Sequence, residues 1–175
     1  MLLTLNSSKI FLKRVVEKSN VQVSYFNEGT FKSNELYKSS PYFIKFNIKK
    51  IIMKNITFND LNSGTLNYIA EGKSYTIPFS TNNVVNSNYF DLSVTLNSLF
   101  EKNQIQNTLS ENNKAYFLIN NVDDVTAELQ SKLEIKLINE AAKTILITVK
   151  DVNANKAKDL VNIVSEEYLS FDVER

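Results

Sequence analysis

Apolar residues recur at helical spacing near both ends of this chain. The pattern predicts helices over residues 3–18, 122–133 and 153–175. We expect the shared face of the first helix to pack into a core. That face carries Phe11, Leu12, Val15 and Val16.

Polar residues that can cap a helix stand at the start of two of these patterns. Asn121 is expected to cap the second helix, and Asn153 or Asp151 the third. The last pattern continues to Arg175 without a closing glycine. We therefore expect residues 153–175 to form a long helix that is truncated at its end.

Between these helices, short alternating runs rich in aromatic and β-branched residues predict strands. Pro78 is expected to end one strand, and the apolar run Thr144–Lys150 is expected to lie centrally in a sheet. The weakly patterned residues 98–114 are expected to form a loop. The predicted strands are 21–25, 42–47, 54–59, 65–70, 73–77, 89–97, 115–119, 133–139 and 144–150.

The order of these elements predicts the fold class. Four strands from residue 42 to residue 77 follow one another through short turns, which indicates a β-meander. We expect one α+β domain over residues 1–175, with a mixed or antiparallel sheet, flanking helices and a long C-terminal helix.

Composition excludes several function classes. The 175 residues are 43% hydrophobic and 22% charged, with a net charge of +1, as is usual for a folded domain. A nucleic-acid partner is not expected, because the longest basic clusters are Lys49-Lys50 and Lys13-Arg14. No window approaches the ~20 apolar residues of a membrane span, so any membrane anchors are expected outside these residues.

The chain contains no His and no Cys. This excludes thiol catalysis, Ser-His-Asp triads and His or Cys zinc sites. The three glycines, Gly29, Gly64 and Gly72, are too far apart for a phosphate-binding or dinucleotide-binding loop. We therefore expect no catalytic residue, no cofactor and no metal.

Paired carboxylates are the remaining catalytic option. Asp123-Asp124 opens a predicted helix, where acidic residues stabilise the helix dipole. Glu166-Glu167 is expected on the solvated face of the last helix, and Asp172 with Glu174 forms a third pair. A structural role is the favoured interpretation for each pair, with a small carboxylate hydrolase as the alternative.

Two stretches resemble one protein family. The first is Phe11–Pro41, with the string Ser-Tyr-Phe-x-x-Gly and then Glu-Leu-Tyr-x-x-Ser-Pro. The second is Thr144–Tyr168, where a strand leads through Asp151, Lys156 and Ala157 into a long helix. Both are similar to periplasmic regions of Wzz/Wzc-type polysaccharide chain-length determinants, especially the tyrosine autokinases of Bacteroidetes. Val152 departs from the family, which often has proline there.

The resemblance implies a non-catalytic periplasmic domain of an inner-membrane protein that controls the length or export of surface polysaccharide. It implies homo-oligomers, the polysaccharide polymerase and export machinery as partners, and membrane helices flanking the domain. It leaves open whether the parent protein carries a cytoplasmic kinase domain. The binding residues, the ring size and the polysaccharide are not predicted.

A carbohydrate-binding β-module is the alternative function. The expected meander carries aromatic residues whose rings could stack on sugars if they are exposed. The competing interpretation is that these rings stabilise cross-strand pairs, and it is the favoured one. The residues in question are Tyr42, Tyr68, Tyr75 and Tyr89.

Overall fold

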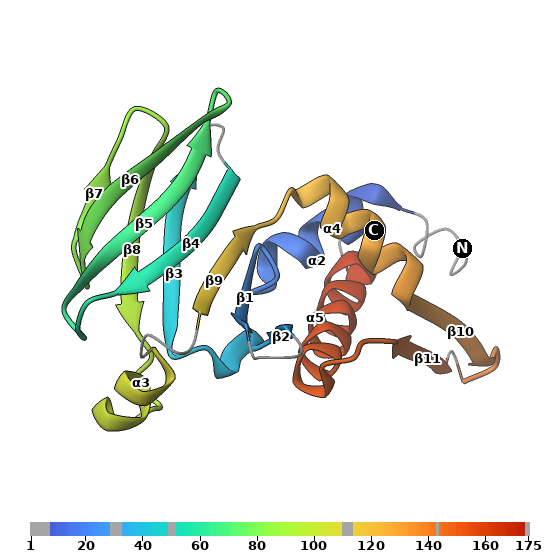
Figure 1. Ribbon diagram of the computed structural model, residues 1–175. Coiled ribbons are helices and arrows are strands. Elements are labelled where there is room, and N and C mark those ends of the chain that lie inside the picture. Colours follow the sequence, from blue (N-terminus) through green and yellow to red (C-terminus); the bar gives the residue numbers. More distant parts are fainter. Residues whose placement is uncertain (1–7, 29–32, 49–51, 110–113, 143, 174–175) are drawn as a thin grey trace. The chain divides into compact units, whose positions relative to one another are not determined.

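The computed structural model describes residues 8–28, 33–48, 52–109, 114–142 and 144–173. The chain divides into two compact units (Figure 1). Unit 1 combines residues 1–22 and 120–175, and unit 2 comprises residues 23–119. The fold is α+β with antiparallel sheets and a long C-terminal helix, as predicted from the sequence. The assignment of residues 1–175 to one domain stays a prediction.

Unit 1 contains the helices α2 (Lys9–Lys18), α4 (Val122–Lys132) and α5 (Ala154–Val173). Residues 3–7 of the first expected helix lie outside the described residues. The side chain of Asn121 caps α4, accepting the N–H of Asp123 at 2.8 Å. The side chain of Asn153 accepts the N–H of Lys156 at 3.1 Å. Of the two expected caps, Asn153 therefore caps α5.

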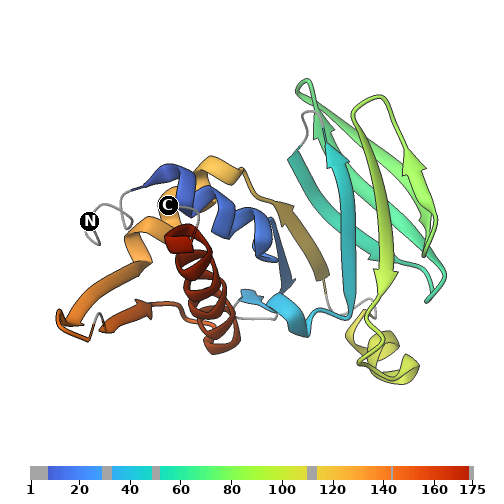
Figure 2. The same ribbon diagram turned by 180° about the vertical axis from the view of Figure 1, so that it is seen from behind.

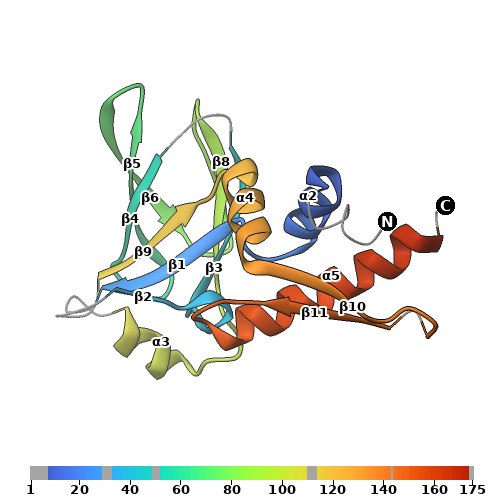
Figure 3. The same ribbon diagram turned by 90° about the vertical axis from the view of Figure 1, so that its right-hand side faces the viewer.

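Strands β10 (Leu133–Asn139) and β11 (Thr144–Val149) form a two-stranded antiparallel ribbon in unit 1, beside α5 (Figure 3). The prediction that the second strand lies centrally in a sheet is wrong. Leu146 is 46% exposed, whereas Val149 is buried where the ribbon begins. A continuous apolar run cannot by itself distinguish a central strand from a ribbon that buries only part of one face.

The described strands of unit 2 form three antiparallel sheets with the strand orders β2-β1-β9, β3-β8-β7 and β4-β5-β6. The predicted meander is confirmed for β4, β5 and β6, which follow one another in the chain and pair in that order. It is wrong for its first strand, residues 42–47, because β3 pairs with β8 in another sheet. The strands are β1 (Val23–Glu28), β2 (Ser33–Glu35), β3 (Tyr42–Ile48), β4 (Ile52–Phe58), β5 (Ser63–Ala70), β6 (Lys73–Ser80), β7 (Val84–Asn86), β8 (Phe90–Leu96) and β9 (Lys114–Ile119).

The sheets β3-β8-β7 and β4-β5-β6 face each other (Figure 2), and the core of unit 2 includes residues of both, together with residues of β1 and β9. Strand β5 alternates buried and half-buried residues, as expected for a strand with one covered face. Its Leu66 is fully buried, and so are Val94 on β8 and Phe117 on β9. The short 3-10 helix η1 (Tyr37–Ser39) precedes β3 and buries Tyr37.

The expectation of a loop over residues 98–114 is wrong in its described part. Helix α3 (Lys102–Thr108) begins with a capping box in which the side chain of Gln104 bonds the backbone N–H of Glu101. Ile105 and Leu109, four residues apart, bury their side chains in the unit 2 core. Two apolar residues at helical spacing and one capping box are sufficient for this short helix.

Pro78 does not end its strand, contrary to the prediction. Strand β6 continues to Ser80, and Pro78 lies opposite Thr65 of β5. Because β6 is an edge strand of its sheet, a residue without an N–H group is tolerated there.

Candidate functional site

A buried carboxylate joins the two helices that come from opposite ends of the chain. Glu167 on α5 is 0% exposed, and its Oε2 lies 3.0 Å from Nε of Arg14 on α2. Its Oε1 contacts the ammonium group of Lys18, also on α2. We call these three residues the α2–α5 clamp.

The clamp corrects one sequence expectation. Glu166 is exposed, as predicted for a solvated face, but Glu167 is not. Glu167 follows Leu160 by seven residues and Val164 by three, and both of these residues are buried. Residues at these spacings share one face of a helix, so Glu167 lies on the buried stripe of α5.

The energetics of the clamp follow from its burial. An ionised carboxylate removed from water costs several kcal/mol unless cations and hydrogen bonds replace the lost hydration. Arg14 and Lys18 supply two cations whose side chains are 33% and 57% exposed and so keep part of their own hydration. The clamp therefore favours one specific pairing of α2 with α5.

A second ionic site holds the entry to α5. The side chain of Asp151 is 1% exposed and accepts hydrogen bonds at 2.8 Å from Nζ of Lys132 and from the N–H of Asn153. Burial acts to raise the pKa of Asp151. The hydrogen bonds from Lys132 and Asn153, with the charge of Lys156, outweigh burial and lower this pKa below its ordinary value.

This site involves the residues that carry part of the family resemblance. Asp151 fixes the turn after β11, Lys156 is buried in the first turn of α5, and Ala157 is half-buried. Val152 is fully exposed, so its side chain does not determine the geometry of the turn. Lys132, the last residue of α4, also binds Glu128 at 2.5 Å, which ties the end of α4 to the start of α5.

A third ion pair joins α2 to α4. Nζ of Lys13 lies 2.8 Å from Oδ1 of Asp123. The hydrogen bond from Lys13 lowers the pKa of Asp123. Asp123 and Asp124 stand in the first turn of α4, as predicted. Unit 1 thus has ionic contacts between α2 and α5, between α2 and α4, and between α4 and the turn that leads into α5.

The third predicted carboxylate pair cannot be placed in the same way. Asp172 belongs to α5, with its side chain outside the described part of the structure, and Glu174 lies outside the described residues.

Three of the four predicted sugar-stacking tyrosines meet in unit 2. The ring centroids of Tyr68 and Tyr75 lie 5.2 Å apart, and those of Tyr75 and Tyr89 lie 5.9 Å apart. Tyr75 and Tyr89 are half-buried. The exposure expected for the other two is wrong, because Tyr68 is 5% and Tyr42 is 0% exposed. Tyr68 alternates with buried Leu66 on β5 and so points inward.

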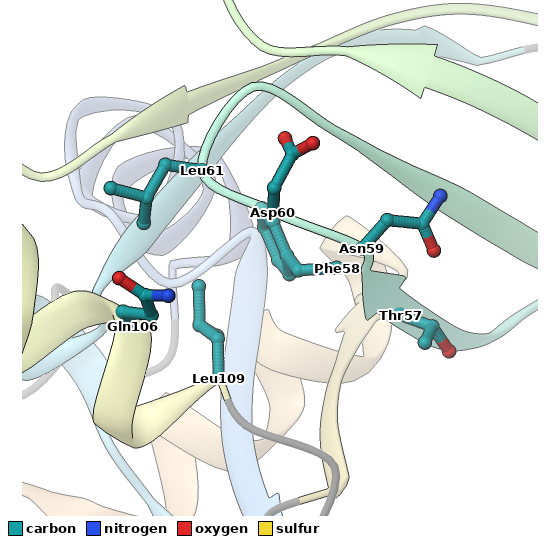
Figure 4. A pocket seen from close by; sticks show the side chains of 7 residues that line it. All are labelled: Thr57, Phe58, Asn59, Asp60, Leu61, Gln106 and Leu109. Atoms are coloured by element: carbon teal, nitrogen blue, oxygen red, sulfur yellow. The ribbon is translucent and has the colours of Figure 1, made fainter.

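Unit 2 also has an open cavity of about 440 Å³ beside α3 (Figure 4). Asp60, the one carboxylate among its described lining residues, accepts the N–H groups of Asn62 at 2.6 Å and Ser63 at 2.8 Å. This carboxylate holds the turn between β4 and β5. The lining residues are Thr57, Phe58, Asn59, Asp60, Leu61, Gln106 and Leu109.

Within the described ranges, no group of three or more acidic side chains is arranged to hold a metal ion. Among the helices that the structure describes, none has the length and apolar character needed to cross a membrane.

Comparison with protein-family models gives no match for this chain, and comparison with curated protein sequences gives none either. The resemblance of Phe11–Pro41 and Thr144–Tyr168 to the Wzz/Wzc-type family therefore stays a prediction.

Proposed function

We propose that this chain is a non-catalytic periplasmic scaffold domain. In this proposal it belongs to an inner-membrane protein that controls the chain length or export of a surface polysaccharide, and it acts through homo-oligomerisation. The observation that carries the proposal is the α2–α5 clamp of Arg14, Lys18 and Glu167.

The clamp supports a scaffold held between two membrane segments. Lys18 and Glu167 are 149 residues apart in the chain, and each belongs to one of the two stretches that resemble the family. Tying α2 to α5 gives a domain whose first and last described helices move as one body, as a protein anchored on both sides requires.

The turn into α5 is a second support. The family pattern of a strand, an Asp-x-x-x-x-Lys-Ala turn and a long helix matches β11, residues 151–157 and α5. In this chain the aspartate of that pattern stabilises the turn, because Asp151 accepts hydrogen bonds from Lys132 and from the N–H of Asn153. A fixed turn sets the direction in which the long helix leaves the strand.

The ionisable groups of unit 1 support a role without catalysis. Glu167, Asp151 and Asp123 each pair with a lysine or an arginine on another segment. A general base or nucleophile needs a carboxylate that faces substrate. These three are engaged in holding helices together.

Anchoring to a membrane raises the effective concentration of neighbouring domains, so a weak contact can assemble a ring there. The partners in this proposal are further copies of the chain and the polysaccharide polymerase and export machinery. A cytoplasmic kinase domain in the parent protein is compatible with it.

The test is sedimentation of the full-length parent protein in lipid nanodiscs, with the isolated 175-residue chain as the matched comparison. We expect the parent to sediment as a closed oligomer and the isolated chain to be smaller. A parent protein that is monomeric at all concentrations, or that lacks membrane segments on either side of this domain, contradicts the proposal.

A further inference from the structure

The turn between β5 and β6 holds a glutamate in an unfavourable backbone conformation. Ala70 pairs with Lys73, so Glu71 and Gly72 form a two-residue hairpin loop. Their φ angles are 50° and 76°, both in the left-handed region. Such loops favour Asn-Gly, Asp-Gly or Gly-Gly, and a residue with a longer side chain is unfavourable at positive φ.

The carboxylate of this strained residue reaches a tyrosine. The hydroxyl of Tyr89, which lies just before β8, donates to Oε2 of Glu71 at 3.4 Å. Strained residues concentrate at sites that bind ligands, where the surrounding structure maintains them.

Two tyrosine rings lie at the surface beside Glu71 on a buried aromatic support. The ring of Tyr68 stacks on that of Tyr75 with an interplanar angle of 16°, and the ring of Tyr89 is tilted by 47° from that of Tyr75. Phe90 meets Tyr68 edge to face at 5.0 Å. Because Tyr68 and Phe90 are buried, the two surface rings are positioned before any ligand arrives.

Polar atoms form a connected line along these rings. A hydrogen bond with Tyr75, partial loss of hydration and the charge of Glu71 raise the pKa of Tyr89 to about 12. Phenol hydroxyls can donate and accept, and a carboxylate accepts up to four hydrogen bonds. The surface thus offers aromatic faces or edges and hydrogen-bonding groups within one small area.

We propose that Glu71, Tyr75 and Tyr89 form a binding site for a neutral pyranose ring of an oligosaccharide. A pyranose presents C–H groups that pack on aromatic rings and hydroxyl groups that bond to phenols and carboxylates. The site goes beyond the scaffold function and does not rest on it, because sugar binding can fail while oligomerisation holds.

A cationic ligand is the competing class, since tyrosines and a carboxylate also form aromatic cages. A cage needs open space between its rings. Here Tyr68 and Tyr75 are in parallel contact, and Tyr89 lies against both, 6.4 Å from Tyr68. The three rings fill the space that an ammonium group would occupy, which favours a sugar on their outer side.

The experiment is an NMR titration of the intact chain, with the tyrosine ring signals observed. The probes are maltotriose, cellotriose, chitotriose and, separately, choline. We expect at least one trisaccharide to shift the signals of Tyr75 and Tyr89, with affinity falling about tenfold in Glu71→Gln and in Tyr89→Phe, which each remove part of a charge-assisted hydrogen bond.

Tyr116→Phe is the matched control, because Tyr116 is a half-buried tyrosine of unit 2 that stacks on Phe26. It should retain the parent affinity, and equal thermal unfolding of all variants shows that each has folded. Three results overturn the proposal: no shift with any trisaccharide at millimolar concentration, a response to choline alone, or a loss of affinity in Tyr116→Phe that equals the loss in Tyr89→Phe.

Discussion

Arg14 of α2 and Glu167 of α5 meet at 3.0 Å, and the carboxylate has no exposed surface. This contact joins segments from opposite ends of the chain into unit 1. It places a charge where burial is costly, so the geometry around it must be maintained.

Glu167→Ala should lower the free energy of unfolding by about 2–3 kcal/mol. The change leaves a cavity between α2 and α5 and two cations without their shared partner. Urea unfolding followed by circular dichroism measures the effect. The neighbouring Glu166→Ala is the control, because Glu166 is exposed and its loss should change stability by no more than about 0.5 kcal/mol. Equal effects of the two substitutions contradict the clamp.

Two neighbouring core tyrosines should respond to loss of the hydroxyl group in opposite ways. The hydroxyl of Tyr25 accepts the N–H of Ile44 at 2.9 Å, so Tyr25→Phe should cost about 1–3 kcal/mol by leaving a buried donor unpaired. The buried hydroxyl of Tyr42 has no hydrogen-bond partner among the described residues. Tyr42→Phe should therefore leave stability unchanged or raise it.

Thermal and urea unfolding of these two variants provide the comparison. The centroids of the two rings lie 5.5 Å apart, so both rings occupy the same part of the core. A difference in burial therefore cannot explain opposite changes in the free energy of unfolding. A loss of stability in Tyr42→Phe as large as that in Tyr25→Phe contradicts this difference in hydrogen bonding between the two hydroxyl groups.

The stability of unit 1 should fall in acid partly because of Asp151. Its pKa is lowered in the folded state, relative to about 3.9 when unfolded. Its contribution is therefore complete above the unfolded pKa and is lost as pH falls through the lowered folded pKa. The difference in unfolding free energy between the parent and Asp151→Asn should shrink from pH 6 toward pH 2. A difference that stays constant with pH rules out this role for the charge.

Gly64 should not tolerate a side chain. A Cβ atom there would lie 2.2 Å from the carbonyl oxygen of Thr57 and 2.6 Å from the ring of Phe79. Gly64→Ala should cost about 1–3 kcal/mol or more, because backbone must shift. Gly72→Asn is the control, since a Cβ at Gly72 meets nothing within 4 Å and asparagine accepts positive φ. Comparable loss in both variants contradicts this packing.

Much of the fold follows from local pattern. The helix over Val122–Lys132 begins after Asn121 as expected, because capping is a local interaction that sequence displays. The strands of the meander also match their predicted runs closely. The prediction that Pro78 ends its strand is wrong because proline is tolerated where no other strand pairs with that side of β6. The order of the elements in the sequence does not show whether β6 has such a neighbour.

The candidate sites depend more on tertiary context. The spacing of Glu167 from Leu160 and Val164 carried a signal for burial, but the partners on α2 lie 149 residues away in the chain. The meeting of Tyr75 with Tyr89 likewise requires the register of β5 and β6 and the path of the chain into β8. The turn Glu71-Gly72 was predictable, whereas the tyrosine that its carboxylate reaches was not.

The scaffold proposal is tested most directly by the length distribution of the surface polysaccharide in cells that produce the parent protein. Gel electrophoresis of the polysaccharide should show a changed or lost modal length when this domain is deleted, and the same change when Glu167→Ala weakens the α2–α5 clamp. Glu166→Ala should leave the distribution unchanged. A normal length distribution in cells that lack the domain contradicts the account.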